Sequence, residues 1–298
     1  MDLFLQLLAD GLVRGSNIVL LALGFSLALG VSGVFHFAHG AIYTLAAYIV
    51  YQCYTRMGVS LPLSVIVAFA VCILVGTGVN QFLYKPLTAR GTGRLLLVLV
   101  SLGALMIIQA LISIIWGTNV LHFQPSEAVA PSAHIVLGPV VMTHVRLATL
   151  LICLGTFALF HYYFLRRTRY GVAMRALISD PTMARVVGVN QSWIITLTYV
   201  TASALAVPGA LLIGWEEGFM PGSGFSLILY SFQAIVIGGL GSIPGTFAGG
   251  MLMGIVASLA HWKLGGQWET AVIFLVFLVF IIARPTGFFG YKVGKAEL

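Results

Sequence analysis

Residues 166–191 read RRTRYGVAMRALISDPTMARVVGVNQ and form the one long basic stretch of an otherwise strongly apolar chain. The stretch carries five of the fifteen lysine and arginine residues, and apolar segments lie on both sides of it. It must therefore lie outside the hydrocarbon of a bilayer, and its positive charge predicts the cytoplasmic face. We expect residues 166–193 to form one cytoplasmic loop.

This loop contains a short helix with signals at both ends. Asp180 is a good N-cap acceptor, and Pro181 suits the first helical position because an N–H there would have no helical partner. Gly188 can adopt the left-handed conformation that follows the last turn of a helix. The predicted helix over 181–187 is about 10 Å long, and we expect it to be a docking element for a soluble partner.

The composition is that of an integral membrane protein. Hydrophobic residues make up 60% of the 298 residues, charged residues make up 8%, and the mean hydropathy is +1.04. A soluble chain carries about 25% charged residues, so we predict a single transmembrane domain over 1–298. The net charge of +7 does not indicate nucleic acid as a partner, because the positive residues are confined to short loops between spans.

Windows of about 20 apolar residues define the candidate helical spans. The longer candidates cover 12–33, 61–83, 95–116, 145–165 and 194–214. The shorter candidates cover 38–54, 225–240, 246–262 and 270–283. The prediction is an all-α polytopic membrane protein with about eight to nine transmembrane or re-entrant helices.

The charges of the loops sort by side. Predicted cytoplasmic bases outside the 166–193 loop are Lys85, Arg90, Arg94, Arg284, Lys292 and Lys295. Predicted outer acids are Glu127, Glu216, Glu217 and Glu269. Three full crossings before Lys85 would place the N-terminus outside, whereas a broken or re-entrant helix within 12–54 would place it inside. We favour the broken helix and an inside N-terminus, because glycines bracket the turn and Arg14 favours an inside start.

No residue pattern in the sequence indicates catalysis or a cofactor. Nucleophile–base pairs, paired carboxylates and metal-ligand spacings do not occur. The nearest match to a phosphate-binding loop is GYKVGK at 290–295. It is one residue too short and lacks the Ser or Thr that follows the lysine, so we do not expect the chain to hydrolyse ATP.

His36 and His39 lie three residues apart, next to Gly40, at the start of a shortened span. An ionisable residue inside a membrane is a functional candidate because an unpaired charge there is costly. A broken helix at the midplane is also a common binding device of transporters. The other reading is two neutral imidazoles bonded to carbonyls that the helix break leaves free. Both readings stay open, and two histidines alone do not complete a metal shell.

A glycine-rich turn, GGLGSIPG at 238–245, joins two short spans. Gly238, Gly239 and Gly241 are candidates for the translocation pathway, because short segments interrupted by glycine and proline are typical of one. An ordinary tight connection is the alternative.

Two other features of the sequence have a structural interpretation. Small-xxx-small steps at 245/249 and 250/254 favour close helix packing. Glu216 and Glu217 are expected at the outer interface beside Trp215, where they could line the outer mouth.

Four motifs occur in order along the chain: FHFAHG (35–40), YGVAMRALISDPTMARVVGVN (170–190), GGLGSIPGT (238–246) and ARPTGFFG (283–290). Together they resemble the bacterial branched-chain amino acid ABC transporter permeases, over about residues 11–290. Within that family the chain is similar to the subunit type that pairs with a second, homologous permease. It departs from the family at His36, where Asn is usual, and at Tyr230, where Lys is often found.

The resemblance implies the membrane half of an ATP-driven importer in the bacterial inner membrane. Its implied partners are a second homologous permease, two cytoplasmic ABC ATPase subunits and a periplasmic substrate-binding protein. In the family the loop docks into the ATPase, which implies a coupling role for the residues Arg175, Asp180, Pro181, Arg185 and Gly188.

The sequence leaves the solute open. Branched-chain amino acids are the default, and urea, short amides and aromatic acids are alternatives within the family. The rival from another class is an ion-coupled carrier with His36 and His39 as proton relays, which would need more buried carboxylates than this chain has.

Overall fold

Helix α1 (Asp2–Ser32) is the central element of the fold, and almost every residue between Gly11 and Val31 is buried. Its most extensive partner is α12 (Ile243–Leu264), followed by α10 (Gln191–Glu216). Because a central transmembrane helix has no lipid-facing side, α1 is apolar around nearly its whole circumference.

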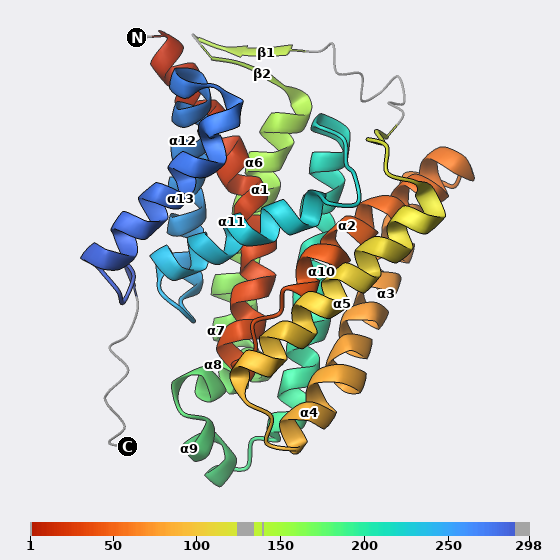
Figure 1. Cartoon of the computed structure of the whole chain (residues 1–298), viewed down its shortest axis with the longest axis vertical. Helices are drawn as coiled ribbons and strands as arrows, with labels where there is room; N and C mark the ends of the chain where they lie inside the picture. The colour runs from red at the N-terminus through yellow and green to blue at the C-terminus, as the bar shows by residue number, and fades with distance from the viewer. Residues whose placement is uncertain (1, 124–133, 139, 290–298) are drawn as a thin grey trace.

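The structure, a computed structural model, describes residues 2–123, 134–138 and 140–289. Glu127, Lys292, Lys295 and the 290–295 segment lie outside these described residues. The elements around α1 are shown in Figure 1. The first half of the chain forms α2 (Ala38–Val50) with a π-helical turn over Tyr51–Arg56, α3 (Leu61–Val79) with a π-helical turn over Asn80–Tyr84, α4 (Lys85–Ala89) and α5 (Arg94–Trp116). The hairpin of β1 (His134–Leu137) and β2 (Val140–Thr143) follows, and then α6 (His144–Ala158) with a π-helical turn over Leu159–Phe164, α7 (Leu165–Arg167), α8 (Arg169–Ser179) and α9 (Pro181–Val186). The last part forms α10, α11 (Ser223–Gly238), α12 and α13 (Gly266–Ala283).

The fold is nearly all α-helical, as predicted. In the described part of the chain, seven helical segments are long and apolar enough to cross a membrane. The spans predicted over 246–262 and 270–283 reach full length, because α12 begins at Ile243 and α13 at Gly266. Helices α2 and α11 stay short. A small antiparallel hairpin, β1 with β2, was not predicted.

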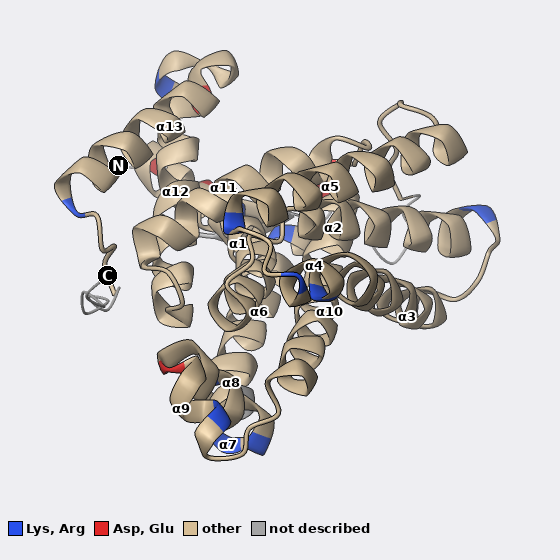
Figure 2. Ribbon diagram, turned by 60° about the horizontal axis from the view of Figure 1, so that its bottom comes forward, with Lys and Arg blue, Asp and Glu red and all other residues tan. Residues whose placement is uncertain are grey.

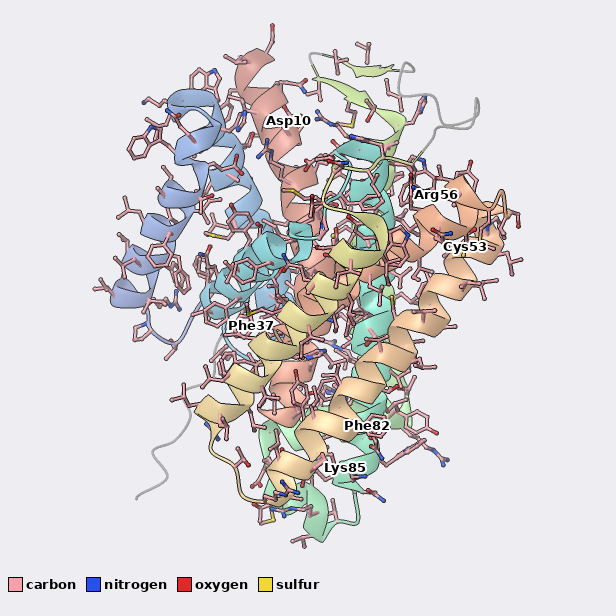
Figure 3. All side chains as sticks on the ribbon, turned by 45° about the vertical axis from the view of Figure 1, so that its right-hand side comes forward. Asp10, Phe37, Cys53, Arg56, Phe82 and Lys85 are labelled. Atoms are coloured by element: carbon pink, nitrogen blue, oxygen red, sulfur yellow. The ribbon has the colours of Figure 1, made fainter. Side chains whose placement is uncertain are left out.

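The bundle has two ends, which we name by the elements they carry (Figure 1). The inner end carries α4 and α7–α9, and the outer end carries the N-terminus and the hairpin. Figure 2, with the inner end turned forward, shows Lys and Arg on the loops and helix ends of that face, while most helix surfaces carry none. Figure 3 places Lys85 near the inner end and Asp10 near the outer end.

The predicted break between the first two helices is present, but the predicted position of the N-terminus is wrong. Helix α1 ends at Ser32, Gly33 has a φ of +70°, and α2 begins at Ala38. Phe37 lies at intermediate depth in Figure 3, and α2 then runs back toward the outer end (Figure 1). The N-terminus therefore lies opposite the basic loop, not beside it.

The physical reason is that polar groups on the first turns of α1 find partners at the outer end. Gln6 exchanges two hydrogen bonds with the backbone of Val141 on β2. Arg14, read from sequence as a sign of an inside start, binds both carboxylate oxygens of Glu269 on α13 at 2.9 Å. Once paired, these groups need not lie on the cytoplasmic side.

Glycines bring the backbones of α12 and its neighbours together, as the small-xxx-small steps predicted. A Cβ added at Gly254 would lie against the backbone of Gly15 on α1, and one at Gly250 against Val19. On the other face of α12, a Cβ at Gly249 would lie against the carbonyl of Ala234 on α11. Without a strong hydrophobic drive between helices in lipid, such close backbone approach supplies the packing energy.

Gly254→Ala should therefore lower the free energy of unfolding by about 1–3 kcal/mol, because the new methyl forces α12 away from α1. The matched control is Gly103→Ala on α5, where an added Cβ meets no atom within 4 Å and alanine should be neutral or stabilising in a helix. Denaturant titration of both variants in detergent would measure the difference. Equal stability would contradict a glycine-dependent α1–α12 contact.

Candidate functional site

The break between α1 and α2 carries a buried group of polar side chains that we call the break cluster. It consists of Ser32, His36, His39, Tyr84, Ser101 and Tyr199. His36 Nδ1 lies 2.9 Å from the Tyr84 hydroxyl, which donates to Ser101 Oγ at 2.8 Å. Ser101 Oγ in turn accepts the backbone N–H of Ala38 at 3.2 Å, so this chain of bonds ends on the first turn of α2.

Aromatic rings enclose His36 on two sides. The Tyr199 and Tyr84 rings meet it edge to face, with centroids 4.9 Å and 5.5 Å away. Ser32 closes the cluster, since its Oγ lies 3.2 Å from the Tyr199 hydroxyl and accepts the N–H of Val34 at 3.2 Å. Six parts of the fold thus meet here: α1, the 33–37 link, α2, the π-helical turn after α3, α5 and α10.

His39 lies in α2 beside His36, with ring centroids 5.7 Å apart. It fits there because α1 has glycine opposite: a Cβ at Gly24 would be 2.7 Å from His39 Nε2. Both histidines are fully buried. His36 Nε2 and both nitrogens of His39 form no well-formed hydrogen bond to the described residues, although the Leu21 backbone lies near His39. Unpaired buried imidazole nitrogens leave polar capacity that water or a solute can satisfy.

A cavity of about 400 Å³ reaches the break cluster from the inner end, and we call it the inner cavity. Its lining includes Lys85, Thr88 and Gln191 at the inner end and Ser32, Tyr84 and Tyr199 of the break cluster, whereas His36 does not line it. The two tyrosines therefore separate His36 from the cavity. A second cavity of about 610 Å³ adjoins it and shares Lys85, Ser192 and Thr196.

Gly40 allows the two short helices to meet. A Cβ there would lie 2.5 Å from the carbonyl oxygen of Gly224 on α11, and Gly224 faces Gly40 in the same way. Thr44 Oγ1 accepts the Gly224 N–H at 2.9 Å. The structure therefore places Gly40 at the crossing of α2 with the first turn of α11.

The other glycine candidates lie at the inner end of α11. Gly239 and Gly241 have φ values of +103° and +80°, which only glycine adopts readily, and they form the turn from α11 to α12. Gly238 packs against the backbone of Gly245. None of these three glycines lines the inner cavity.

A side chain from the basic loop, that of Ile178, packs against this turn. Ile178 on α8 lies between α1 and the turn, so that a Cβ added at Gly30 or at Gly241 would be 3.3 Å from it. The buried residues of α8, Gly171, Met174 and Leu177, follow the same helical face. One side chain, which the sequence did not single out, thus brings the basic loop into contact with the last turn of α1 and with the glycine turn.

The caps predicted for the short helix are present. Asp180 Oδ1 accepts the N–H groups of Thr182 and Met183 at 2.8 Å and 2.9 Å. Gly188 has a φ of +88°, and the Val189 N–H bonds the Ala184 carbonyl, the wrapped ending expected of a left-handed glycine. Helix α9 ends at Val186, one residue before the predicted end.

The two arginines of the loop that were predicted to couple, Arg175 and Arg185, differ in their contacts. Arg175 donates from Nε to the Leu165 carbonyl at 3.1 Å, so it fastens α8 to α7. Arg185 bonds within α9, to the Pro181 carbonyl at 3.2 Å, and its side chain is exposed. Around Arg185 the apolar side chains of Met183, Val186 and Val187 are 62–76% exposed. An exposed apolar patch on a polar loop indicates a surface that a partner covers.

Sequence reasoning missed Tyr84, Ser101, Tyr199 and Ile178. The three hydroxyl residues lie 48 to 163 residues after His36 in the sequence. No local sequence pattern predicts contacts over such distances along the chain. The one available signal was a buried-polar residue in an apolar span, since Ser101 and Tyr199 each interrupt one.

Comparison with known proteins gives a consistent picture. Residues 7–283 match the family model described as "Branched-chain amino acid transport system / permease component". The chain is 33% identical over 303 residues to the high-affinity branched-chain amino acid transport system permease protein BraD of Pseudomonas aeruginosa, covering 96% of each. It is 29% identical over 300 residues to the corresponding protein LivH of Escherichia coli K12, again covering 96% of each. The solved structure of PsaBC from Streptococcus pneumoniae in complex with Fab shares the fold, with a TM-score of 0.51 at 13% identity over 95% of this chain and 92% of that chain.

Tyr84→Phe removes the hydroxyl that His36 and Ser101 share. Because both partners are buried, we expect the free energy of unfolding to fall by about 1–3 kcal/mol. The control Tyr170→Phe, with a half-exposed ring on α8, should change it by less than about 0.5 kcal/mol. Denaturation in detergent followed by circular dichroism measures both. If Tyr84→Phe is as stable as the control, the hydroxyl does not hold the break cluster together.

Proposed function

This chain belongs to the family of permease components of branched-chain amino acid transport systems, and from that membership we propose that it is the membrane-spanning subunit of an ATP-driven importer. It is a multi-pass protein of the inner membrane. Its relatives are transport subunits rather than enzymes. The proposed solute is a branched-chain amino acid, which is what the names of those relatives specify; urea, a short amide or an aromatic acid is the alternative.

The observation that carries the proposal is the placement of the basic loop and the inner cavity at the same end of the bundle. Helix α9 offers a capped, partly apolar surface beyond the spans, and α8 contacts the last turn of α1 and the glycine turn through Ile178. A partner that moves α9 would also move α8. Helix α8 packs against the last turn of α1, which carries Ser32 of the break cluster. This is the arrangement that a coupling loop requires.

We assign the partners accordingly. Two cytoplasmic ABC ATPase subunits would dock on α9 and its neighbours, a second homologous permease would complete the membrane domain, and a periplasmic binding protein would deliver the solute. His36 and His39, together with Gly40, would border the translocation route near its middle. The glycine turn would take part in coupling rather than line the route, because Ile178 packs against it. This role falls to Gly238, Gly239 and Gly241.

The ion-coupled carrier is less well supported. Among the described residues, no Asp or Glu belongs to the buried polar side chains, so the two buried histidines have no carboxylate relay beside them. A proton path through an apolar bundle needs such ionisable groups in series.

Reconstitution tests the proposal directly. Proteoliposomes holding this chain, the second permease and the ATPases should accumulate radiolabelled leucine only with ATP inside and the binding protein outside. Accumulation driven by an ion gradient without ATP would replace the proposal by the carrier. Accumulation of urea in preference to leucine would keep the importer and change its solute.

Arg185→Glu should weaken docking without disturbing the membrane domain, because it reverses an exposed charge in the middle of the apolar patch on α9. We expect the dissociation constant for the ATPases to rise about tenfold or more, equivalent to about 1.4 kcal/mol, in a pull-down titration in detergent. Arg56→Glu, an exposed arginine near the outer end in Figure 3, is the control and should bind as the wild type does. Wild-type association of Arg185→Glu would remove α9 from the interface.

Ile178→Ala should separate docking from transport. The complex should assemble and hydrolyse ATP, but uptake per ATP should fall about 2- to 30-fold, the range of 0.5–2 kcal/mol typical of a residue that carries coupling. Ser179→Ala, on the exposed side of α8, is the matched control. Unchanged uptake per ATP in Ile178→Ala would mean that α8 transmits motion by another contact.

A further inference from the structure

A separate cavity of about 210 Å³ lies at the outer end, between α1, α6, α10 and α12. We call it the outer cavity. Asp10, labelled near the top of Figure 3, marks its position. Charged groups and apolar ones line it together, among them Arg146, Glu216 and Glu217, and Val13 and Trp262.

Most of the charges around the outer cavity are paired. Arg146 donates from Nη1 to Asp10 at 2.8 Å and from Nε to Oε1 of Glu216 at 2.6 Å. Arg14, which also lines the cavity, is held by both oxygens of Glu269 at 2.9 Å. The charge of Arg14 is therefore neutralised by Glu269. Among the described residues, the Arg146 guanidinium is left as the one arginine to balance the acids that line the cavity.

The pairing leaves the cavity with an excess of negative charge. Three carboxylates line it, those of Asp10, Glu216 and Glu217, and Arg146 balances one of them. The Glu216 side chain is only 10% exposed, and its Oε2 has no hydrogen-bond partner among the described residues. Glu217 forms no ion pair to the described residues and adjoins Glu216 in sequence. A largely buried carboxylate oxygen without a donor is costly, so this region is built to accept a positive group.

The size and lining of the cavity select the kind of cation. Among the described residues no three His, Cys, Asp or Glu side chains gather closely enough to hold a metal ion. Leu7, Val13 and Trp262 supply apolar walls, which suit a hydrocarbon chain, and an indole face also attracts an organic cation. A primary ammonium offers three donors to carboxylate acceptors.

We propose that the outer cavity binds the primary ammonium group of a small aliphatic amine or amino acid, with Glu217 and Glu216 as acceptors and Trp262 beside the hydrocarbon part. The proposal rests on the proposed function in one respect, since an amino acid delivered to the outer end carries such a group. It gives Glu216 and Glu217 a role beyond the membrane interface. It also separates amino acids from urea and amides, which have no ammonium group.

Binding of 3-methylbutylammonium to the purified full chain in detergent tests this without any partner subunit. Titration calorimetry should show saturable binding to the wild type, and 4-methylpentanoate, which has a similar chain but no ammonium, should not bind. Glu217→Gln should raise the dissociation constant at least tenfold. This variant is preferred to one at Glu216, which is paired with Arg146. Because Glu217 forms no such ion pair to the described residues, removal of its charge should not disturb folding.

The matched control is Asp2→Asn, an exposed carboxylate on α1 that does not line the cavity, and its affinity should equal that of the wild type. Binding should also change the tryptophan fluorescence, because Trp262 lines the cavity, and Trp262→Phe should abolish that change. Failure of the wild type to bind the amine, or an unchanged affinity in Glu217→Gln, would overturn the proposal. A complex that imports leucine with ATP but does not bind the amine would sink this inference and leave the proposed function standing.

Discussion

The backbone of the two short helices must be satisfied inside the protein, and the rest of the structure depends on this constraint. In lipid an open N–H or carbonyl group costs several kcal/mol, so a helix that begins or ends within the bundle needs partners from other elements. At the start of α2, Ser101 of α5 accepts the Ala38 N–H. At the start of α11, Thr44 of α2 accepts the Gly224 N–H.

These capping contacts also decide where the polar chemistry lies. The same Ser101 that caps α2 receives the hydroxyl of Tyr84, and Tyr84 bonds His36. The break cluster is thus an extension of a helix cap. Its tyrosines line the inner cavity and also pack against the ring of His36, so they lie between the cavity and that histidine.

Features that depend on neighbouring residues could be predicted from the sequence. Asp180 and Gly188 act within four residues of their own helix ends, and the glycine steps of α12 recur at a fixed spacing. Such local patterns can be predicted from the sequence alone. The Gly33 break is of the same kind.

Features that depend on distant residues could not be predicted. Arg14 looked like a cytoplasmic anchor because its partner, Glu269, lies 255 residues away. Ile178 is one apolar residue among many until Gly30 and Gly241 are seen on either side of it. The candidate site could therefore be predicted only in part: His36, His39 and the loop were found, but not the hydroxyls around His36 or the Ile178 side chain that joins the loop to the end of α1.

The end of α11 has a consequence for the making of the protein. The carbonyls of Ile237 and Gly238 are bonded by the N–H groups of Phe288 and Phe289, which follow α13. About fifty residues separate donors from acceptors, and a ribosome adding about 5–20 residues per second needs several seconds to bridge them. During that interval the two carbonyls lack the partners that they have in the folded chain. The end of α11 is thus completed by a segment that is made only after α12 and α13 have been synthesised.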